Sequence, residues 1–351
     1  MSNARVTQKV QLVGMDISEM ENLAARHYEL PFRGKQLFHW VYKQQVNSID
    51  AMNTLPSIFR DLLADQYVLH PLILIKKTGS ALEPTQKFLL QLPSGEKIES
   101  VIMEEGKRVT LCVSTQVGCA VDCKFCATAK MGFIKNLTAG EIVDQYLLIL
   151  NSINKRITNV VFMGMGEPFL NYQQVVNAAN LLNHKEGINL SAKKITISTV
   201  GIIPKITQYA KEGHKYKLAI SLNGSNQDQR FKIMPISKKY SMDALIQSAW
   251  DYYYISKKLI TLEYVLLAGV NDDIADADRL MVLIGDLPCK LNLIPYNEID
   301  GLFHRSSEEK IERFVNRLEH ANFTVTIRWS KGTDISGGCG QLAVLDKENY
   351  K

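Results

Sequence analysis

The amino-acid sequence predicts an α/β protein in which helices cover a parallel sheet, with a small helical module in front of it. Three observations support this fold class. Residues 1–70 place apolar side chains at helical spacing, residues 72–114 carry closely spaced strand patterns, and the chain after Ser114 alternates strand and helix patterns. Repeated units of this length are typical of a doubly wound sheet or a barrel. A hydrophobic fraction of 46% gives a chain of 351 residues a sizeable core.

The N-terminal third contains two kinds of pattern. In residues 1–70, the segments "ISEMENLAARHY" and "LPFRGKQLFHWVYKQQV" repeat apolar side chains every three or four positions, which predicts a small helical module. Residues 71–104 change to short strands around the turn "PSGE", and their closeness in sequence favours antiparallel pairing. Residues 1–105 contain 11 Lys/Arg and 12 Asp/Glu, so the overall charge of +5 comes from the rest of the chain.

The third pattern is a regular succession of strands and helices from residue 105 to residue 334. A helix is expected to begin at Thr138, because Thr138-Ala139-Gly140-Glu141 fits a capping box. Strands are expected at 108–114, 157–165, 193–201, 217–223, 259–267, 290–297 and 323–330, and further helices from about 171 and at 203–211, 242–254, 276–285 and 307–320.

Several polar residues stand where the predicted strands end. They are Glu167, Ser198, Ser221, Asn223 and Asn297. A Ser or Asn at such a position is more often a simple turn residue than a functional one. However, both candidate architectures place their chemistry at the carboxyl ends of the strands. Together these residues predict a polar mouth above the sheet.

Composition excludes some classes of protein. No apolar run approaches the roughly 18 residues of a membrane span, and the N-terminus "MSNARVTQKVQLVGMD" lacks the apolar core of a signal peptide. We therefore expect a cytoplasmic protein without membrane contact. Six cysteines are too few for a disulfide scaffold. A pI of ≈ 8.7 is compatible with a polyanionic partner but does not require one.

Three of the six cysteines lie in the segment "GCAVDCKFCATAKMGF", as Cys119, Cys123 and Cys126. Three thiolates at C-x3-C-x2-C spacing favour a four-iron four-sulfur cluster in which one iron has no protein ligand. The alternative is a structural zinc ion with a distant fourth ligand. No second C-x2-C or H-x3-H pair supports that alternative.

This motif, directly after a first strand, resembles the radical S-adenosylmethionine (SAM) signature. The longer stretch "STQVGCAVDCKFCATAKMGF", with "MGMGEP" and "GTDISGGCGQL", resembles the RlmN/Cfr family of RNA adenosine methyltransferases, most closely its RlmN branch. The resemblance runs from about Pro31 to the end of the chain. It implies a partial (β/α)6 radical SAM barrel at 105–334, after an RNA-binding helical domain at 1–70 and a β linker at 71–104, and a C-terminal tail at 335–351 with the methylatable cysteine.

The resemblance also implies two cofactors. The three clustered cysteines would hold a 4Fe-4S cluster, and its open iron would bind the amino and carboxylate groups of SAM, which an electron then cleaves to a 5′-deoxyadenosyl radical. Residues matching the family's SAM contacts are Gly166, Glu167, Ser198, Ser221, Leu222, Asn223 and Asn297. The family usually has His at the position of Asn223, so a role that needs a charged imidazole would be lost here.

Two solitary cysteines match the residues that carry the methyl group. Cys339, in "SGGCG", matches the cysteine that is methylated by one SAM before the radical from a second SAM activates the methyl. Its glycine-rich surroundings favour a mobile tail over a buried packing role. The family usually has Asp and small residues where Ser336, Gly337 and Gly338 stand, which puts the ordering of this loop in question.

Cys112 matches the resolving thiol, which would attack the sulfur of Cys339 and leave a transient disulfide. Such a bond needs Cα atoms within about 7 Å, so the tail would have to fold back over the first strand. Glu99 matches a proposed proton acceptor, and a solvated carboxylate is the alternative. Cys289 matches no family role and is expected to be structural.

The partners implied by the resemblance are 23S rRNA, a tRNA as a second substrate, and a reducing protein such as flavodoxin, with the enzyme a monomer. In the N-terminal module, Arg33, Lys35, Trp40 and Lys43 combine cations with an aromatic ring, although Trp40 and Phe38 could equally form the core of the module.

Three alternatives to this function stay open. They are methylation at carbon 8, as in the Cfr branch, a divergent paralogue with another RNA substrate, suggested by Asn223, and a non-catalytic RNA-binding protein that holds zinc.

Overall fold

The computed structural model describes residues 9–80 and 82–344, so parts of the predicted first domain (1–8) and C-terminal tail (345–351) lie outside the described residues. The N-terminal module contains α1 (Ile17–Arg26), α2 (Pro31–Phe38), a π-helical turn (His39–Gln44) and α3 (Ser57–Gln66). Asp16 and Glu19 form the capping box that starts α1. The module also has two short strands that the helical pattern did not predict. These are β1 (Val10–Gln11) and β2 (Tyr67–Val68), which pair in parallel.

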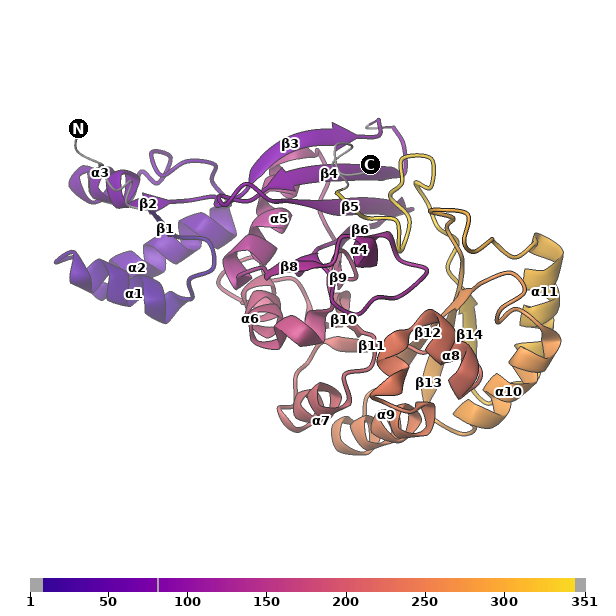
Figure 1. Cartoon of the computed structure of the whole chain (residues 1–351). Coiled ribbons are helices and arrows are strands. Elements are labelled where there is room, and N and C mark those ends of the chain that lie inside the picture. The colour runs from indigo at the N-terminus through magenta and orange to yellow at the C-terminus, as the bar shows by residue number, and fades with distance from the viewer. Residues whose placement is uncertain (1–8, 81, 345–351) are drawn as a thin grey trace, which may run out of the picture.

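A ten-stranded mixed sheet forms the body of the molecule (Figure 1). In spatial order its strands are β14 (Thr324–Ile327), β13 (Cys289–Pro295), β12 (Ile260–Leu266), β11 (Lys217–Ser221), β10 (Ile195–Thr199), β9 (Asn159–Phe162), β6 (Arg108–Cys112), β5 (Lys97–Glu105), β4 (Thr85–Gln91) and β3 (Ile73–Thr78). From β6 to β14 every neighbouring pair is parallel. The sheet has β14 and β3 as its edges and does not close, which agrees with a partial barrel.

The predicted antiparallel pairing in the β region is confirmed, since β3, β4, β5 and β6 pair antiparallel in sequence order. This region is continuous with the barrel sheet, because β6 pairs with β5 on one side and with β9 on the other. A small antiparallel pair, β7 (Gln116–Gly118) and β8 (Phe133–Asn136), brackets the cysteine segment.

Helices alternate with the parallel strands along the chain and lie outside the sheet (Figure 1). They are α5 (Ala139–Ser152), α6 (Tyr172–Asn183), α7 (Ile203–Lys211), α9 (Met242–Ser256), α10 (Ile274–Ile284) and α11 (Glu308–Arg317), with the short α4 (Ala127–Lys130) and α8 (Gln227–Ile233) in loops at the carboxyl ends of strands. The capping box predicted at Thr138 and Glu141 is present at the start of α5. In the described residues, no helix is long and apolar enough to span a membrane.

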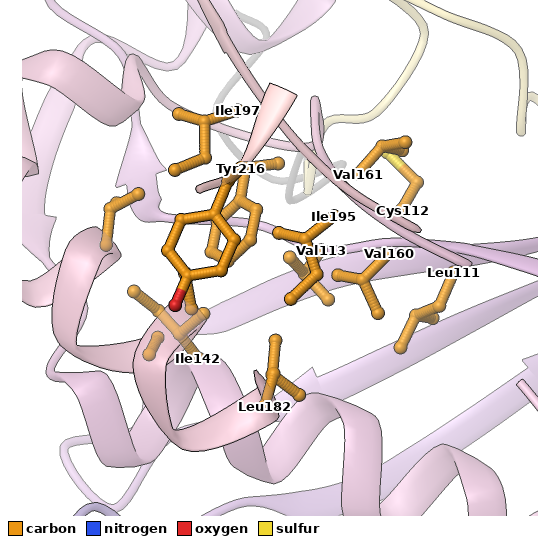
Figure 2. Packing of buried hydrophobic residues seen from close by; sticks show 14 of the residues in the cluster. Leu111, Cys112, Val113, Ile142, Val160, Val161, Leu182, Ile195, Ile197 and Tyr216 are labelled. Atoms are coloured by element: carbon orange, nitrogen blue, oxygen red, sulfur yellow. The ribbon is translucent and has the colours of Figure 1, made fainter. Parts of the chain in front are cut away.

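The main core lies between the sheet and these helices. Figure 2 shows Leu111 and Val113 on the side of Ile142 from α5 and Leu182 from α6, whereas Cys112 lies beside Val161. Successive side chains of a strand point to opposite faces, so burying Leu111 and Val113 against the helices turns Cys112 toward the concave face. The same alternation in β9, β10, β11 and β12 sends one set of side chains to the core and the other into the barrel.

A buried polar bridge joins the end of the N-terminal module to the barrel. His70, just after β2, pairs through Nδ1 with Oδ1 of Asp144 on α5 at 2.5 Å, and Oδ2 of Asp144 accepts from the backbone N–H of Leu72 at 2.9 Å. Burial lowers the pKa of His70, but the hydrogen bond and charge of Asp144 outweigh it and raise this pKa overall. The bridge fixes the chain at the point where the module ends and the sheet begins.

We expect Asp144→Ala to lower the free energy of unfolding by about 3–5 kcal/mol, because it leaves the Leu72 N–H and a buried His70 without their partner. Urea denaturation followed by circular dichroism measures this change. Asp61→Ala, at an exposed position of α3, is the matched control and should change stability by less than about 0.5 kcal/mol. Equal effects of the two substitutions would show that the bridge is not needed for stability.

Candidate active site

The three clustered cysteines lie in a loop held on all sides by backbone hydrogen bonds. Cys119 follows β7 and donates its N–H to the carbonyl of Gly132 at 2.9 Å. Gly118 has φ +70°, and a Cβ there would lie 1.7 Å from the Gly132 oxygen, so only glycine allows this approach. Farther along the loop, the N–H of Lys124 bonds to Ile233 at 2.9 Å and that of Ala127 to Gly340 at 2.7 Å. The loop is therefore fixed by the β7–β8 pair, by α8 and by the C-terminal tail.

The chemistry of these thiols fits a cationic metal cluster. Burial raises the pKa of Cys119 to about 12 and that of Cys123 well above its usual value, and the charges of the neighbouring thiolates raise both further. A bound metal provides the positive charge that keeps such thiols deprotonated. In the part of the chain that the structure describes, no group of three or more His, Cys, Asp or Glu side chains is placed so that it could hold a metal ion. The fit of these cysteines to an iron–sulfur cluster therefore rests on their number, their spacing and the loop that carries them.

A cavity of ≈ 970 Å³, including space open to solvent, lies next to this loop at the carboxyl ends of the strands. Cys123 and Cys126 line it from one side. The predicted cofactor-binding residues Gly166, Glu167, Ser198, Ser221 and Asn223 also line it. The predicted polar mouth is therefore a real cavity beside the cluster cysteines. Leu222 and Asn297 are the exceptions, because neither residue lines the cavity. The side chain of Leu222 is fully buried in the main core.

Glu167 connects the ends of two neighbouring strands. Its carboxylate accepts from the N–H of Phe169 through Oε1 and from that of Val200 through Oε2, both at 2.8 Å, and its own N–H donates to Gln116 at 2.8 Å. Burial raises the pKa of Glu167 to about 7, although these hydrogen bonds oppose the shift. Gly166 has φ +99°, and a Cβ there would meet the Gln116 side chain at 2.5 Å. The "MGMGEP" turn thus shapes one wall of the cavity.

The two predicted asparagines hold the backbone around the cavity. Asn223 has φ +54°, a conformation that Asn tolerates better than most residues, and its Oδ1 accepts from the N–H of Val265 at 2.9 Å. Asn297 donates through Nδ2 to the carbonyl of Cys339 and to Oγ of Ser330, both at 2.9 Å. Among the described residues, the Oδ1 of Asn297 is buried without a hydrogen-bond partner.

The C-terminal tail folds back over the barrel, as the resemblance required (Figure 1). Beyond the bond from Ala127 to Gly340, Thr128 donates through Oγ1 to the carbonyl of Leu342 at 2.6 Å, and the N–H of Ala343 donates to Oε2 of Glu99 at 3.1 Å. Gly338 is buried, and a Cβ there would lie 2.7 Å from Nδ2 of Asn297. The glycines around Cys339 therefore permit close packing in this structure, and the loop is not an exposed tail.

Cys112 and Cys339 line the same cavity as Cys123 and Cys126, and both thiols are free. Cys119 does not line it. Burial raises the pKa of Cys112 to about 12 and that of Cys339 to about 11. The charge on Cys339 raises the pKa of Cys112 further. Cys289 is buried on β13 in the main core, as expected for a structural residue.

Glu99 is buried, not solvated. Its Oε1 pairs with Nζ of Lys87 at 2.9 Å while Oε2 accepts from Ala343. Burial raises the pKa of Glu99, and Lys87 opposes that rise. In this structure the Glu99 carboxylate holds Ala343, four residues after Cys339 in the C-terminal tail.

The sequence pattern missed two charged residues that face the same cavity, Glu263 on β12 and Arg328 just after β14. Glu263 lies level with Ser221 of β11 and Asn292 of β13 in the parallel register. The alternation in "LITLEYVLL" could have identified Glu263, because its charge interrupts an otherwise apolar strand. Arg328 carries no comparable signal.

In the N-terminal module the structure favours packing for Trp40. Its indole N–H donates to Oγ1 of Thr54 at 2.8 Å and its ring packs against the core that includes Phe38. Lys43 is exposed, Lys35 lies 3.5 Å from Glu21, and the guanidinium of Arg33 stacks over the exposed ring of Phe32 at 4.6 Å. Phe32 and Arg33 are thus better placed for contact with a base than Trp40 is.

The open parallel barrel and the three-cysteine loop beside a cavity at its strand ends define a radical SAM enzyme. Residues 113–281 match the family described as the radical SAM superfamily, and residues 10–69 match the ribosomal RNA large subunit methyltransferase N-terminal domain.

More specifically, the chain belongs to the RlmN family. It is 41% identical to a probable dual-specificity RNA methyltransferase RlmN from Thermotoga neapolitana, over 94% of this chain and 95% of the relative. It is 38% identical to one so named from Clostridium novyi, over 97% and 98%. The crystal structure of a radical SAM methyltransferase from Sphaerobacter thermophilus superposes with a TM-score of 0.92 at 40% identity, covering 95% of this chain and 99% of that one.

We expect Cys123→Ser to abolish the bound iron and sulfide of anaerobically reconstituted protein, because a hydroxyl does not replace a thiolate ligand. Iron and sulfide assays with visible absorbance measure the loss. Cys289→Ser is the control and should keep the full content. If the Cys123 variant retained its iron, the assignment of the loop as the cluster site would be wrong.

We expect Gly338→Ala to leave the iron content unchanged but to reduce methylation of Cys339 at least about tenfold, since the added Cβ displaces the loop from Asn297. Intact-mass analysis after incubation with SAM measures the methyl group. Gly213→Ala is a useful control, because a Cβ at this φ +67° glycine meets no atom within 4 Å. Equal methylation of Cys339 in the Gly338 variant and the parent would contradict the proposed need for close packing.

Proposed function

We propose that this chain methylates carbon 2 of an adenosine in 23S rRNA, and of a tRNA as a second substrate, through a methyl group carried on Cys339. The observation that carries the proposal is the shared cavity. Two free thiols, Cys112 and Cys339, face the space that the cluster cysteines and the strand-end residues also line. A methyltransferase that used SAM by direct displacement would not need a second pair of thiols there.

Cys119, Cys123 and Cys126 would hold the 4Fe-4S cluster, and Gly166, Glu167, Ser198, Ser221 and Asn223 would surround SAM. When bound, the cluster and SAM supply the methyl group and the radical that activates it. Carbon 2 of adenine is flanked by two electronegative nitrogens and is not nucleophilic, so a methyl cation equivalent has nothing to react with. A carbon radical can add to such a ring, which explains the need for this cofactor pair.

The residues of the chain then perform two sulfur reactions. The Cys339 thiolate first displaces the methyl from the sulfonium, giving a thioether. The methyl of this thioether would lose a hydrogen atom to the radical, and its carbon would bond to carbon 2 of the adenine; the adduct would then give up one electron to the cluster and the carbon-2 hydrogen as a proton. The Cys112 thiolate attacks the Cys339 sulfur, so that the Cys112–Cys339 disulfide bond forms while the sulfur–methylene bond breaks. The electron pair of the broken bond stays on the methylene carbon, which takes up a proton to become the methyl group of the released base. The resemblance also assigns proton acceptance to Glu99. Its bonds to Lys87 and Ala343 favour a role in holding the tail.

The names of the relatives favour RNA as the substrate and the RlmN activity over carbon 8. The net charge of +5 and the Phe32–Arg33 pair suit a polyanionic partner with accessible bases. We also propose, in agreement with the resemblance, that a small reducing protein such as flavodoxin donates the electron. The enzyme would be a monomer and would act in the cytoplasm. Asn223 accepts from the N–H of Val265 through Oδ1 and from Nδ2 of Asn271 through its backbone carbonyl, and these contacts support a role for Asn223 in shaping the cavity.

We expect reconstituted protein with SAM and a reductant to form 2-methyladenosine in 23S rRNA and tRNA fragments, as measured by mass spectrometry of digested RNA. Cys339→Ala and Cys112→Ala should each abolish product, and the Cys112 variant alone should retain RNA covalently bound to Cys339, because the releasing thiol is missing. Cys289→Ala is the control and should remain active.

Formation of 8-methyladenosine would instead assign the carbon-8 activity. Unmodified Cys339 in protein that methylates RNA would refute the proposed intermediate.

A further inference from the structure

Arg328 places a partly buried cation in the cavity that Cys112 and Cys339 also line. Its backbone N–H donates to the carbonyl of Leu293 at 2.8 Å, which extends the β13–β14 ladder by one bond. In that register Leu293 is level with Ile327 of β14, so Arg328 follows the last paired residue of the strand. The side chain faces the concave side, because Thr326, two positions earlier, lies on that same face.

The hydrogen-bond partners of the guanidinium are weak. Nη1 lies 3.4 Å from Sδ of Met163 and Nη2 lies 3.8 Å from Sδ of Met103. A thioether sulfur is a poor acceptor, and a guanidinium normally binds carboxylate, phosphate or carbonyl oxygens. Among the described residues the guanidinium makes no salt bridge. A partly buried cation without such an oxygen partner has its charge available for another anion.

Four negatively charged or ionisable groups act on this cation from the surrounding elements. They are Cys339 of the tail, Glu263 of β12, Cys112 of β6 and Glu105 of β5. Burial lowers the pKa of Arg328, but these four groups together raise it, so Arg328 stays cationic. In the opposite direction, Arg328 lowers the pKa of both Cys112 and Cys339, whereas Glu263 raises both. Cys126 of the cysteine loop also raises the pKa of Cys339, and Cys339 raises that of Cys112.

We propose that Arg328 is the shared cation that stabilises negative charge first on the sulfur of Cys339 and then on the sulfur of Cys112. This inference rests on the roles proposed above for the two thiols. The methyl transfer consumes one thiolate and the release step consumes the other, and the two are not charged at the same stage, since Cys339 is a neutral thioether when Cys112 attacks. Because Arg328 lines the same cavity as both cysteines, a single guanidinium can serve both steps. Glu263 holds the opposite charge and opposes each ionisation.

The test measures thiolate character without RNA or catalytic turnover. Reconstituted protein is treated anaerobically with iodoacetamide between pH 7 and pH 10, and the rates at Cys112, Cys339 and Cys289 are read separately by peptide mass spectrometry. In this reaction the thiolate forms a bond to the acetamide carbon while the carbon–iodine bond breaks and iodide leaves. The rate therefore follows the thiolate fraction.

We expect Arg328→Met to slow alkylation of Cys112 and Cys339 by about tenfold, which corresponds to a rise of about one unit in their pKa values. Arg328→Lys should stay within about threefold of the parent protein, because it keeps the charge. Glu263→Gln should accelerate both thiols, which a purely structural role of the cavity wall would not produce. Arg313→Met, at an exposed position of α11, is the matched control.

Cys289 reports on folding, because it is buried far from these charges and only burial raises its pKa. If Arg328→Met also accelerates alkylation of Cys289, that variant has unfolded. The Arg328→Lys and Glu263→Gln variants then decide whether the proposal holds. Rates at Cys112 and Cys339 within twofold of the parent in folded Arg328→Met would overturn the proposal. So would a Glu263→Gln protein that is not faster, or parent thiols that do not react even at pH 10. None of these results depends on methylation of RNA, so they are separable from a failure of the proposed function.

Discussion

The alternation of side chains along the parallel strands is the constraint on which both the core and the cavity depend. In β6 it buries Leu111 and Val113 against the helices and turns Cys112 to the concave face. In β12 it buries Leu262 and Tyr264 in the core and turns Glu263 to the cavity. The parallel register then brings Ser221, Glu263 and Asn292 to one level of the barrel. A shift of one residue in a strand would exchange core side chains for cavity side chains, so the ladder that stabilises the fold also positions the chemistry.

Much of the fold and of the cavity follows from local patterns in the sequence. Glu167, Ser198 and Ser221 could be predicted because a strand pattern ends beside each of them, and parallel strands end at one edge of a sheet. Residues whose surroundings come from distant segments could not be predicted in the same way. In the sequence, Glu99 has the pattern of an exposed carboxylate on a strand. In the structure it is buried by contacts with Lys87 and with Ala343 of the C-terminal tail. In the sequence, Arg328 is simply a residue at the end of a predicted strand. Only the pairing of β14 with β13 shows which way its side chain points.

The glycines around Cys339 have a different role in the structure from the one that the sequence suggests. A glycine-rich segment around Cys339 suggests mobility, and the same composition serves a mobile tail or a closely packed one. Here Gly338 lies against Asn297 as Gly118 lies against Gly132, so in both loops the missing side chain makes room for a neighbouring segment. The cysteine loop and the tail are then joined by the bond from Ala127 to Gly340. The cysteine loop and the segment that contains Cys339 are consequently fixed relative to each other by the main chain.

The way the tail is held has a consequence for how the chain can be shortened. Cys339 is positioned in part by residues that follow it, because the carbonyls of Gly340 and Leu342 and the N–H of Ala343 make three of the bonds that hold the tail to the barrel. A deletion that begins at residue 341 would spare every predicted site residue, yet it would remove two of these three bonds. The C-terminal boundary of the functional unit is therefore set by this anchoring segment, several residues beyond the last reactive side chain.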